Sequence, residues 1–136
     1  MSTKIFVNLP VKDLGKSIDF FTELGFSFNA QFTDENATCL IISDDIYAML
    51  LVEPFFKTFT NKDIVDATKS TEAILALGVD SRQRVNELVD KALAAGGLPG
   101  HFASDQGFMY GRSFQDPDGH MWEVLYMEPA AVQQEV

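Results

Sequence analysis

The segment FQDPDGHMWEV, residues 114–124, holds the acidic side chain whose setting could support chemistry. Pro117 and Gly119 favour a tight turn, because proline fixes φ and glycine accepts the backbone angles at the turn exit. The residues after the turn are predicted to form a strand, whose side chains alternate between two faces. Glu123 then shares its face with methionine and leucine side chains. A carboxylate in that setting needs a metal, a proton or a partner, so Glu123 is the first candidate functional residue.

Two chemical roles and one structural role are open for Glu123. Apolar surroundings raise the pKa of a carboxyl group, which would suit a general base that removes a proton next to a carbonyl. A carboxylate can also serve as a ligand of a divalent metal. The structural alternative is a pair with a core donor such as Arg112 or a tyrosine, because many buried charges are simply paired.

Composition and charge exclude several classes of partner. The 136 residues are 46% hydrophobic, which is enough for one compact domain. A net charge of −10 repels phosphate backbones and anionic lipids, so neither nucleic acid nor a membrane is expected as a partner. The start MSTKIF does not resemble a signal peptide, and we expect a cytoplasmic protein. The single Cys39 is predicted to be a buried core thiol, which fits a reducing compartment.

The first half of the chain reads as a strand, a helix and three further strands. Asp13 is a candidate N-cap of the helix, and Gly25 is expected to end it. The predicted strands are KIFVNLPV (residues 4–11), FSFNAQF (26–32), ATCLIIS (37–43) and IYAMLLVE (46–53).

The second half repeats this order. Ser81 is the candidate N-cap and Gly96 the candidate stop of its helix. The predicted strands are EAILALGVD (residues 72–80), a short irregular one near Pro99 to Ser104, FMYGRSF (108–114) and HMWEVLYM (120–127). Each half of roughly 60 residues cannot bury both faces of its own sheet, so the two are expected to pack as βαβββ modules.

We predict a single domain over residues 1–136, with modules at about 3–54 and 71–129 joined by residues 55–70. The connecting segment contains a short helix candidate, residues 62–68. It also contains Phe55, Phe56 and Phe59, which could cover a pocket mouth or an interface, or could simply pack in the core.

Three blocks of the sequence together resemble the glyoxalase, bleomycin-resistance and extradiol-dioxygenase proteins of the vicinal oxygen chelate superfamily. They are VKDLGKSIDFFTELGF (residues 11–26), ILALGVDS (74–81) and the DPDG turn (116–119) that precedes Glu123. The resemblance implies an α+β fold in which two βαβββ modules form a cupped, barrel-like mixed sheet with helices on the outside. It also implies a pocket in that cup and, in many members, a divalent metal.

The metal ligands implied by the resemblance are mostly missing from this chain. The histidine of the first strand falls on Phe6, and that of the second module's opening strand falls on Ile74. The glutamate position of the first module falls at or near Met49, so only Glu123 matches. One carboxylate binds a divalent metal too weakly for a catalytic site. We therefore expect no metal and no other cofactor, with Glu123 as a ligand only if a metal is present.

Without the metal, the cup becomes a concave apolar surface that suits a small organic molecule. Its expected lining is Phe6, Asn8, Met49, Leu51, Ile74, Ala76, Tyr110, Arg112 and Met121, with Glu123 as the candidate catalytic group. The favoured function is a ligand-binding protein similar to the bleomycin-resistance members. One alternative is a lactoylglutathione-lyase-like or ring-cleaving dioxygenase-like enzyme that uses Glu123 as metal ligand or general base. The other is a structural dimer module with a vestigial pocket.

The purified protein should hold less than one divalent metal ion per chain, because three of the four implied ligand positions carry apolar side chains. Elemental analysis after dialysis against a chelator measures this. One Ni, Zn, Fe or Mn per chain that survives the chelator would contradict the expectation.

The chain should form a two-fold symmetric homodimer, because members of the family it resembles commonly pair and two-fold closure is the usual assembly of small oligomers. Light scattering at micromolar concentration should give twice the mass of one chain. A mass equal to one chain would overturn this expectation.

Overall fold

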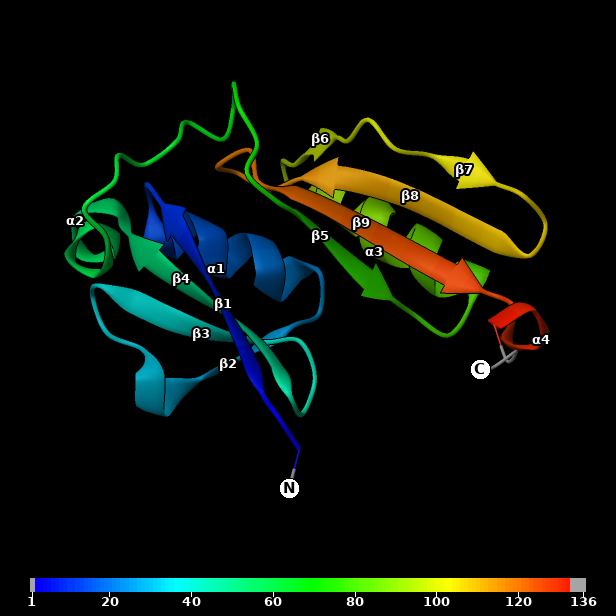
Figure 1. The fold of residues 1–136 in the computed structure, drawn as a ribbon, viewed down its shortest axis with the longest axis horizontal. Coiled ribbons are helices and arrows are strands. Elements are labelled where there is room, and N and C mark those ends of the chain that lie inside the picture. Colours follow the sequence, from blue (N-terminus) through cyan, green and yellow to red (C-terminus); the bar gives the residue numbers. More distant parts are fainter. Residues whose placement is uncertain (1, 133–136) are drawn as a thin grey trace. The chain divides into compact units, whose positions relative to one another are not determined.

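The computed structural model describes residues 2–132, which fall into two compact units, one within Met1–Val65 and one within Asp66–Val136 (Figure 1). The first unit contains β1 (Ile5–Val11), α1 (Leu14–Glu23), β2 (Ser27–Asn29), the 3-10 turn η1 (Ala30–Phe32), β3 (Ala37–Ile41), β4 (Ile46–Val52), α2 (Glu53–Phe56) and the 3-10 turn η2 (Lys57–Phe59). The second contains β5 (Ile74–Gly78), α3 (Arg82–Ala94), β6 (Leu98–Pro99), β7 (Ser104–Asp105), β8 (Met109–Gln115), β9 (Met121–Met127) and α4 (Pro129–Val132).

Each unit forms its own mixed sheet, and the two sheets have the same strand order. The first runs β1-β4-β3-β2, and the second runs β5-β9-β8-β6 with β7 also paired to β8. In both, the opening strand pairs in parallel with the last strand, and the other pairs are antiparallel. The predicted α+β class with two βαβββ modules is confirmed. Within residues 2–132 the strands make two sheets, where the sequence led us to expect one barrel-like sheet.

The helix boundaries follow the capping residues that the sequence indicates. The Asp13 carboxylate accepts from the amide of Lys16, and the Ser81 hydroxyl accepts from the amide of Arg84, so each helix starts on a capped first turn. After the helices the chain turns at Gly25 and at Gly96, whose φ angles are +98° and +104°.

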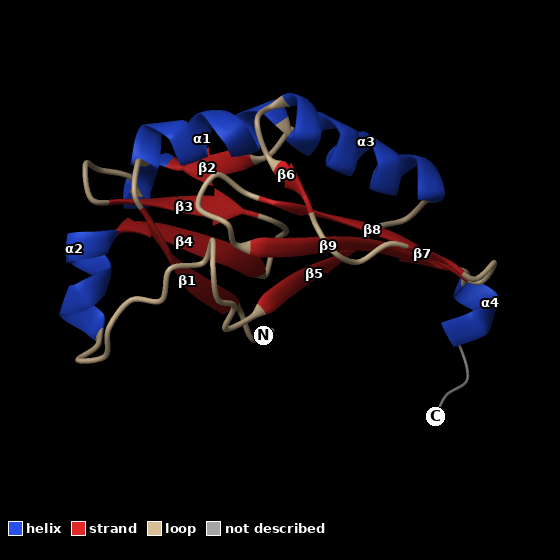
Figure 2. Ribbon diagram, turned by 90° about the horizontal axis from the view of Figure 1, so that it is seen from above, coloured by secondary structure: helices blue, strands red, loops and turns tan. Residues whose placement is uncertain are grey.

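Each of these two helices covers one face of its own sheet. Helix α1 contacts β3 and β4, and α3 contacts β8 and β9 (Figure 2). The buried apolar side chains of the helices are Phe20, Phe21 and Leu24 at α1 and Val85, Leu88, Val89 and Ala92 on α3. Cys39 is buried, as predicted. No helix within the described residues combines the length and the apolar character needed to cross a membrane.

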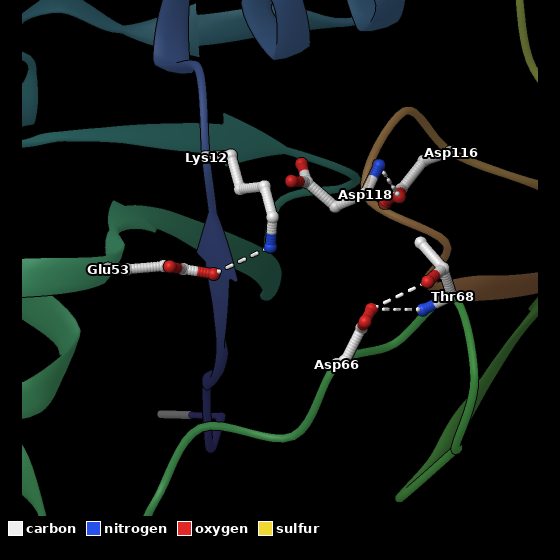
Figure 3. A network of polar contacts seen from close by, with 6 residues as sticks. All are labelled: Lys12, Glu53, Asp66, Thr68, Asp116 and Asp118. Atoms are coloured by element: carbon white, nitrogen blue, oxygen red, sulfur yellow. Dashed lines mark hydrogen bonds and ion pairs between the residues drawn. The ribbon is translucent and has the colours of Figure 1, made fainter.

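Two predicted elements differ from the structure. The predicted strand over residues 26–32 stops at Asn29, because the Asn29 side chain accepts from the amide of Gln31 and starts the turn η1. The predicted helix over residues 62–68 is wrong. The Asp66 carboxylate accepts from both the amide and the hydroxyl of Thr68, at 3.0 and 2.6 Å, and so makes a local turn (Figure 3). The short helix lies earlier, at Glu53–Phe56.

The turn between β8 and β9 is organised by the carboxylate of Asp116. Its Oδ1 accepts from the amide of Asp118 at 3.0 Å (Figure 3). The same Oδ1 accepts from the amide of His120 at 3.0 Å, and Oδ2 accepts from the indole Nε1 of Trp122 at 3.1 Å. Burial raises the pKa of this carboxyl group, although His120 and the three N–H donors act in the opposite direction. Two acceptor oxygens facing three N–H groups match the ionised form.

Gly119 is required in the same turn for two reasons. Its φ of +91° is strained for any residue with a side chain, and a Cβ atom there would lie 2.8 Å from backbone atoms of Ala67 and Thr68. The DPDG turn therefore packs directly on the backbone of the Asp66 turn.

Asp116→Asn should destabilise the fold by about 1–3 kcal/mol, because the amide nitrogen that replaces Oδ2 cannot accept from the indole N–H of Trp122, so that bond is lost. Urea unfolding at neutral pH measures the loss. In a Trp122→Phe background no indole N–H remains, so the same substitution should cost clearly less. Equal costs in the two backgrounds would contradict the role given to the indole bond.

Candidate functional site

The face of the second sheet that points away from α3 carries Glu123. We call it the C-terminal face, and it is formed by Ile74, Ala76, Ser113, Gln115, Met121, Glu123 and Leu125. Glu123 lies in register with Ala76 of β5 on one side and with Ser113 of β8 on the other. Its side chain is half-buried, while Ala76 is exposed and Ser113 is buried. The carboxylate is therefore most open on the side of β5.

No described residue forms a hydrogen bond or an ion pair with Glu123. The alternative pairing with Arg112 is not realised, because Arg112 donates to Asn86 at 3.0 Å and to Asp90 at 2.9 Å on α3. Arg112 is in register with Val124, which is buried, so it extends from the opposite face of the sheet to Glu123.

Tyr110 and Arg112 were predicted to line the ligand pocket, and the structure places both on the helix side of the second sheet. The hydroxyl of Tyr110 donates to Asn86 at 2.6 Å, and the Arg82 guanidinium lies 4.4 Å from the centre of the Tyr110 ring. Arg82 also pairs with Asp105, and the amide of Gly107 together with Arg82 holds the pKa of Asp105 below its ordinary value. This network fastens α3 to β7 and β8.

A short segment between β6 and β7 covers part of the C-terminal face. The Ser113 hydroxyl donates to the carbonyl of Phe102 at 2.6 Å. The Phe102 ring and the Leu125 side chain both close over Gly111, where a Cβ atom would lie 2.6 and 2.5 Å from them. Sequence reasoning missed Phe102 and Ser113. The sequence offered one indication of them: Gly100 and Gly111, because glycine in or beside a strand often marks a close approach of another segment.

In the first unit, the sheet face that carries Phe6 also carries the other predicted lining residues of that unit. Phe6, Asn8 and Pro10 of β1 are in register with Tyr47, Met49 and Leu51 of β4. We call this the N-terminal face. Phe6 and Asn8 are exposed, whereas Leu9 and Val11 on the other side of the same strand are buried. The structure thus places Phe6, Asn8, Met49 and Leu51 on one face, but Leu51 is buried and is not part of its open surface.

The Phe6 ring stacks on the ring of Tyr47, with centroids 4.8 Å apart and planes inclined by 12°. Phe6 remains 47% exposed, so one flat apolar surface stays open at the edge strand of this sheet. Tyr47 was not among the predicted residues. Tyr47 lies two residues before Met49 in the predicted strand IYAMLLV, so the alternation of side chains along that strand could have placed both on one face.

The residues of the two faces do not fit the divalent metal that the family resemblance implies. Phe6 and Ile74 have no lone pair to donate, and the thioether of Met49 is a poor ligand for hard cations. Among the described residues no group of three or more His, Cys, Asp or Glu side chains is placed to hold a metal ion. Glu123 is the one implied ligand position with a suitable donor.

The comparison with known families and curated proteins gives one partial match. Residues 3–43 match the model of the bleomycin resistance protein-like N-terminal family. None of the curated proteins matches this chain.

The comparison with solved structures covers nearly the whole chain. A hypothetical protein, SA1046, from S. aureus is 30% identical, with 93% of this chain and 95% of that chain covered and a TM-score of 0.76. A glyoxalase/bleomycin resistance protein/dioxygenase family enzyme from Burkholderia phytofirmans PsJN is 15% identical, with coverages of 93% and 99% and a TM-score of 0.77. The antibiotic binding protein TnmS3 from Streptomyces sp. CB03234 is 19% identical, with coverages of 93% and 97% and a TM-score of 0.64. Residues 3–43 therefore resemble the bleomycin resistance protein-like N-terminal family, and the chain has the fold of the glyoxalase/bleomycin resistance protein/dioxygenase proteins.

Proposed function

We propose that this protein binds a small organic molecule on a sheet face that its long helix, α1 or α3, leaves uncovered, and that it does so without a complete metal centre. The observation that carries the proposal is the setting of Glu123. It is one carboxylate without a partner among the described residues, in register with Ala76 and flanked along β9 by Met121 and Leu125. Apolar surfaces with a few polar points are typical of small-molecule sites.

The N-terminal face supports the same proposal. The exposed Phe6 ring, stacked on Tyr47, stands where the family resemblance implies a metal-binding histidine. An exposed aromatic ring offers a flat ligand an apolar surface and a favourable stacking geometry. Methionine side chains such as Met49 adapt to ligands of different shape. The residues that stand at the implied metal-ligand positions thus suit the binding of an organic molecule.

The match to the bleomycin resistance protein-like family and the similarity to an antibiotic binding protein favour sequestration over turnover. An antibiotic is accordingly the first class of ligand to test. A screen by thermal melting should include bleomycin, because a ligand that binds only the folded state raises the melting temperature. A vestigial pocket would give no shift with any compound.

An enzymatic role remains the second candidate, and the accessibility of Glu123 is what favours it. A carboxylate without a structural partner is available as a general base for a substrate proton. Incubation with methylglyoxal and glutathione, with and without added divalent metal, tests the lyase form of this role. Product formation above the rate without protein would favour the enzyme over the binding protein.

Glu123→Gln should lower the affinity for a compound found in the melting screen by about ten- to a hundredfold, the loss expected for one charge-assisted hydrogen bond. The free energy of unfolding should change by less than about 0.5 kcal/mol, because no partner is left stranded. Calorimetric titration and urea unfolding on the same variant measure both quantities.

The matched control is Glu23→Gln, which removes the same charge from the exposed last turn of α1. It should leave both affinity and stability unchanged. A large loss of stability in Glu123→Gln with unchanged affinity would mean that Glu123 has a structural role and would defeat the functional assignment.

A further inference from the structure

We propose that Glu123 selects ligands that carry a cationic nitrogen, such as a protonated amine or a guanidinium group. The inference rests on the proposed binding function and specifies the chemical class of ligand that the C-terminal face takes. The carboxylate is the charged group on that face, and its neighbours in register are the methyl group of Ala76 and the hydroxyl of Ser113.

The hydrogen-bonding capacity at Glu123 is that of an acceptor. An ionised carboxylate only accepts hydrogen bonds, and its strongest partners are cationic N–H donors. The one hydroxyl in register with it, on Ser113, already donates to the carbonyl of Phe102. A ligand must therefore bring the donor, and a ligand with a negative group would meet an uncompensated like charge.

Two arginines of the same unit are held by acidic or amide side chains away from Glu123. Arg112 is held by Asn86 and Asp90, and Arg82 is held by Asp105, all on the helix side. Because side chains of alternate residues leave a sheet on opposite faces, Arg112 cannot reach Glu123 without a change of register. The positive charge that would complete this face is left for a ligand to supply.

The surroundings of Glu123 strengthen this preference. Half-burial among Met121, Leu125 and Ala76 removes part of the water around the carboxylate, and charge-assisted bonds are stronger where water is excluded. The net charge of −10 also concentrates cations near the protein and repels anions. The exposed Ala76 leaves the carboxylate accessible from the side of β5.

The same carboxylate could attract a metal cation, but the face does not offer a coordination shell. Apart from Glu123, its side chains are aliphatic or thioether, except for Ser113 and Gln115, which already donate to the carbonyls of Phe102 and Pro99. Hard divalent cations need several oxygen ligands. An organic cation needs one carboxylate and an apolar surface for its body, and this is what the C-terminal face provides.

The test compares three probes of the same shape and different charge: 1-naphthylmethylamine, 1-naphthalenemethanol and 1-naphthoate. The amine should bind the wild-type protein about ten- to a hundredfold more tightly than the alcohol, and naphthoate should bind most weakly. NMR titration gives the dissociation constants, and the amide shifts of β5 and β9 show whether the probe sits on the C-terminal face. The titrations are run in the presence of EDTA and repeated with added Mg²⁺ or Zn²⁺.

Two variants isolate the carboxylate. Glu123→Gln should lower the affinity for the amine to that for the alcohol, and the affinity for the alcohol should stay unchanged. Ala76→Lys places an ammonium group directly across from Glu123 on the neighbouring strand, so it should weaken the amine while Glu123 itself stays in place. Glu23→Gln serves again as the control, and melting curves of all variants confirm that they are folded.

The outcomes separate this inference from the proposed function. Equal binding of amine and alcohol, or an amine advantage that survives Glu123→Gln, would overturn the cation preference and leave a binding protein. Binding that appears only with added metal, or tighter binding of naphthoate, would also overturn it. If none of the probes binds and the antibiotic screen is also negative, the proposed function and the inference fail together.

Discussion

The hydrogen bonds to Asp116 set the register of β8 against β9, and the position of Glu123 depends on that register. The carboxylate joins the turn amides to the indole of Trp122 on β9. Trp122 in turn stacks on Phe114, its partner in register on β8, in the core beneath α3. A slip of one residue would move Glu123 toward the helix and Trp122 away from it. The turn that buries Trp122 against α3 therefore also fixes Glu123 on the face that points away from α3.

Features set by residues close together in the sequence could be predicted from the sequence alone. The alternation along HMWEVLYM separates Trp122 and Val124 from Glu123, and the structure shows the first two buried and the third half-buried. The caps at Asp13 and Ser81 depend on one side chain and an amide three residues later, so they are also local. The duplication of βαβββ order followed from such local patterns repeated twice.

Features that depend on pairing between distant segments could not be predicted in the same way. Tyr110 and Arg112 belong to the helix side because β8 pairs with β9 in one register, and Asn86 on α3 then receives both side chains. The strand pattern alone does not say which of its two faces meets the helix. The helix predicted over residues 62–68 is absent for a different reason. Seven residues form a helix only with tertiary support, and the local bonds of Asp66 to Thr68 compete with it.

The separation of charges across the second sheet connects these observations to binding. Arg112 and Glu123 lie on neighbouring strands, but the pleat directs them to opposite faces, where Arg112 meets Asp90 and Glu123 meets no charged partner among the described residues. An internal ion pair on the C-terminal face would satisfy the carboxylate and close it to ligands. The bonds of Arg112 to Asn86 and Asp90 instead tie the sheet to α3 and keep the carboxylate of Glu123 open. The free energy forgone by leaving Glu123 unpaired is then available to any ligand that brings the missing donor.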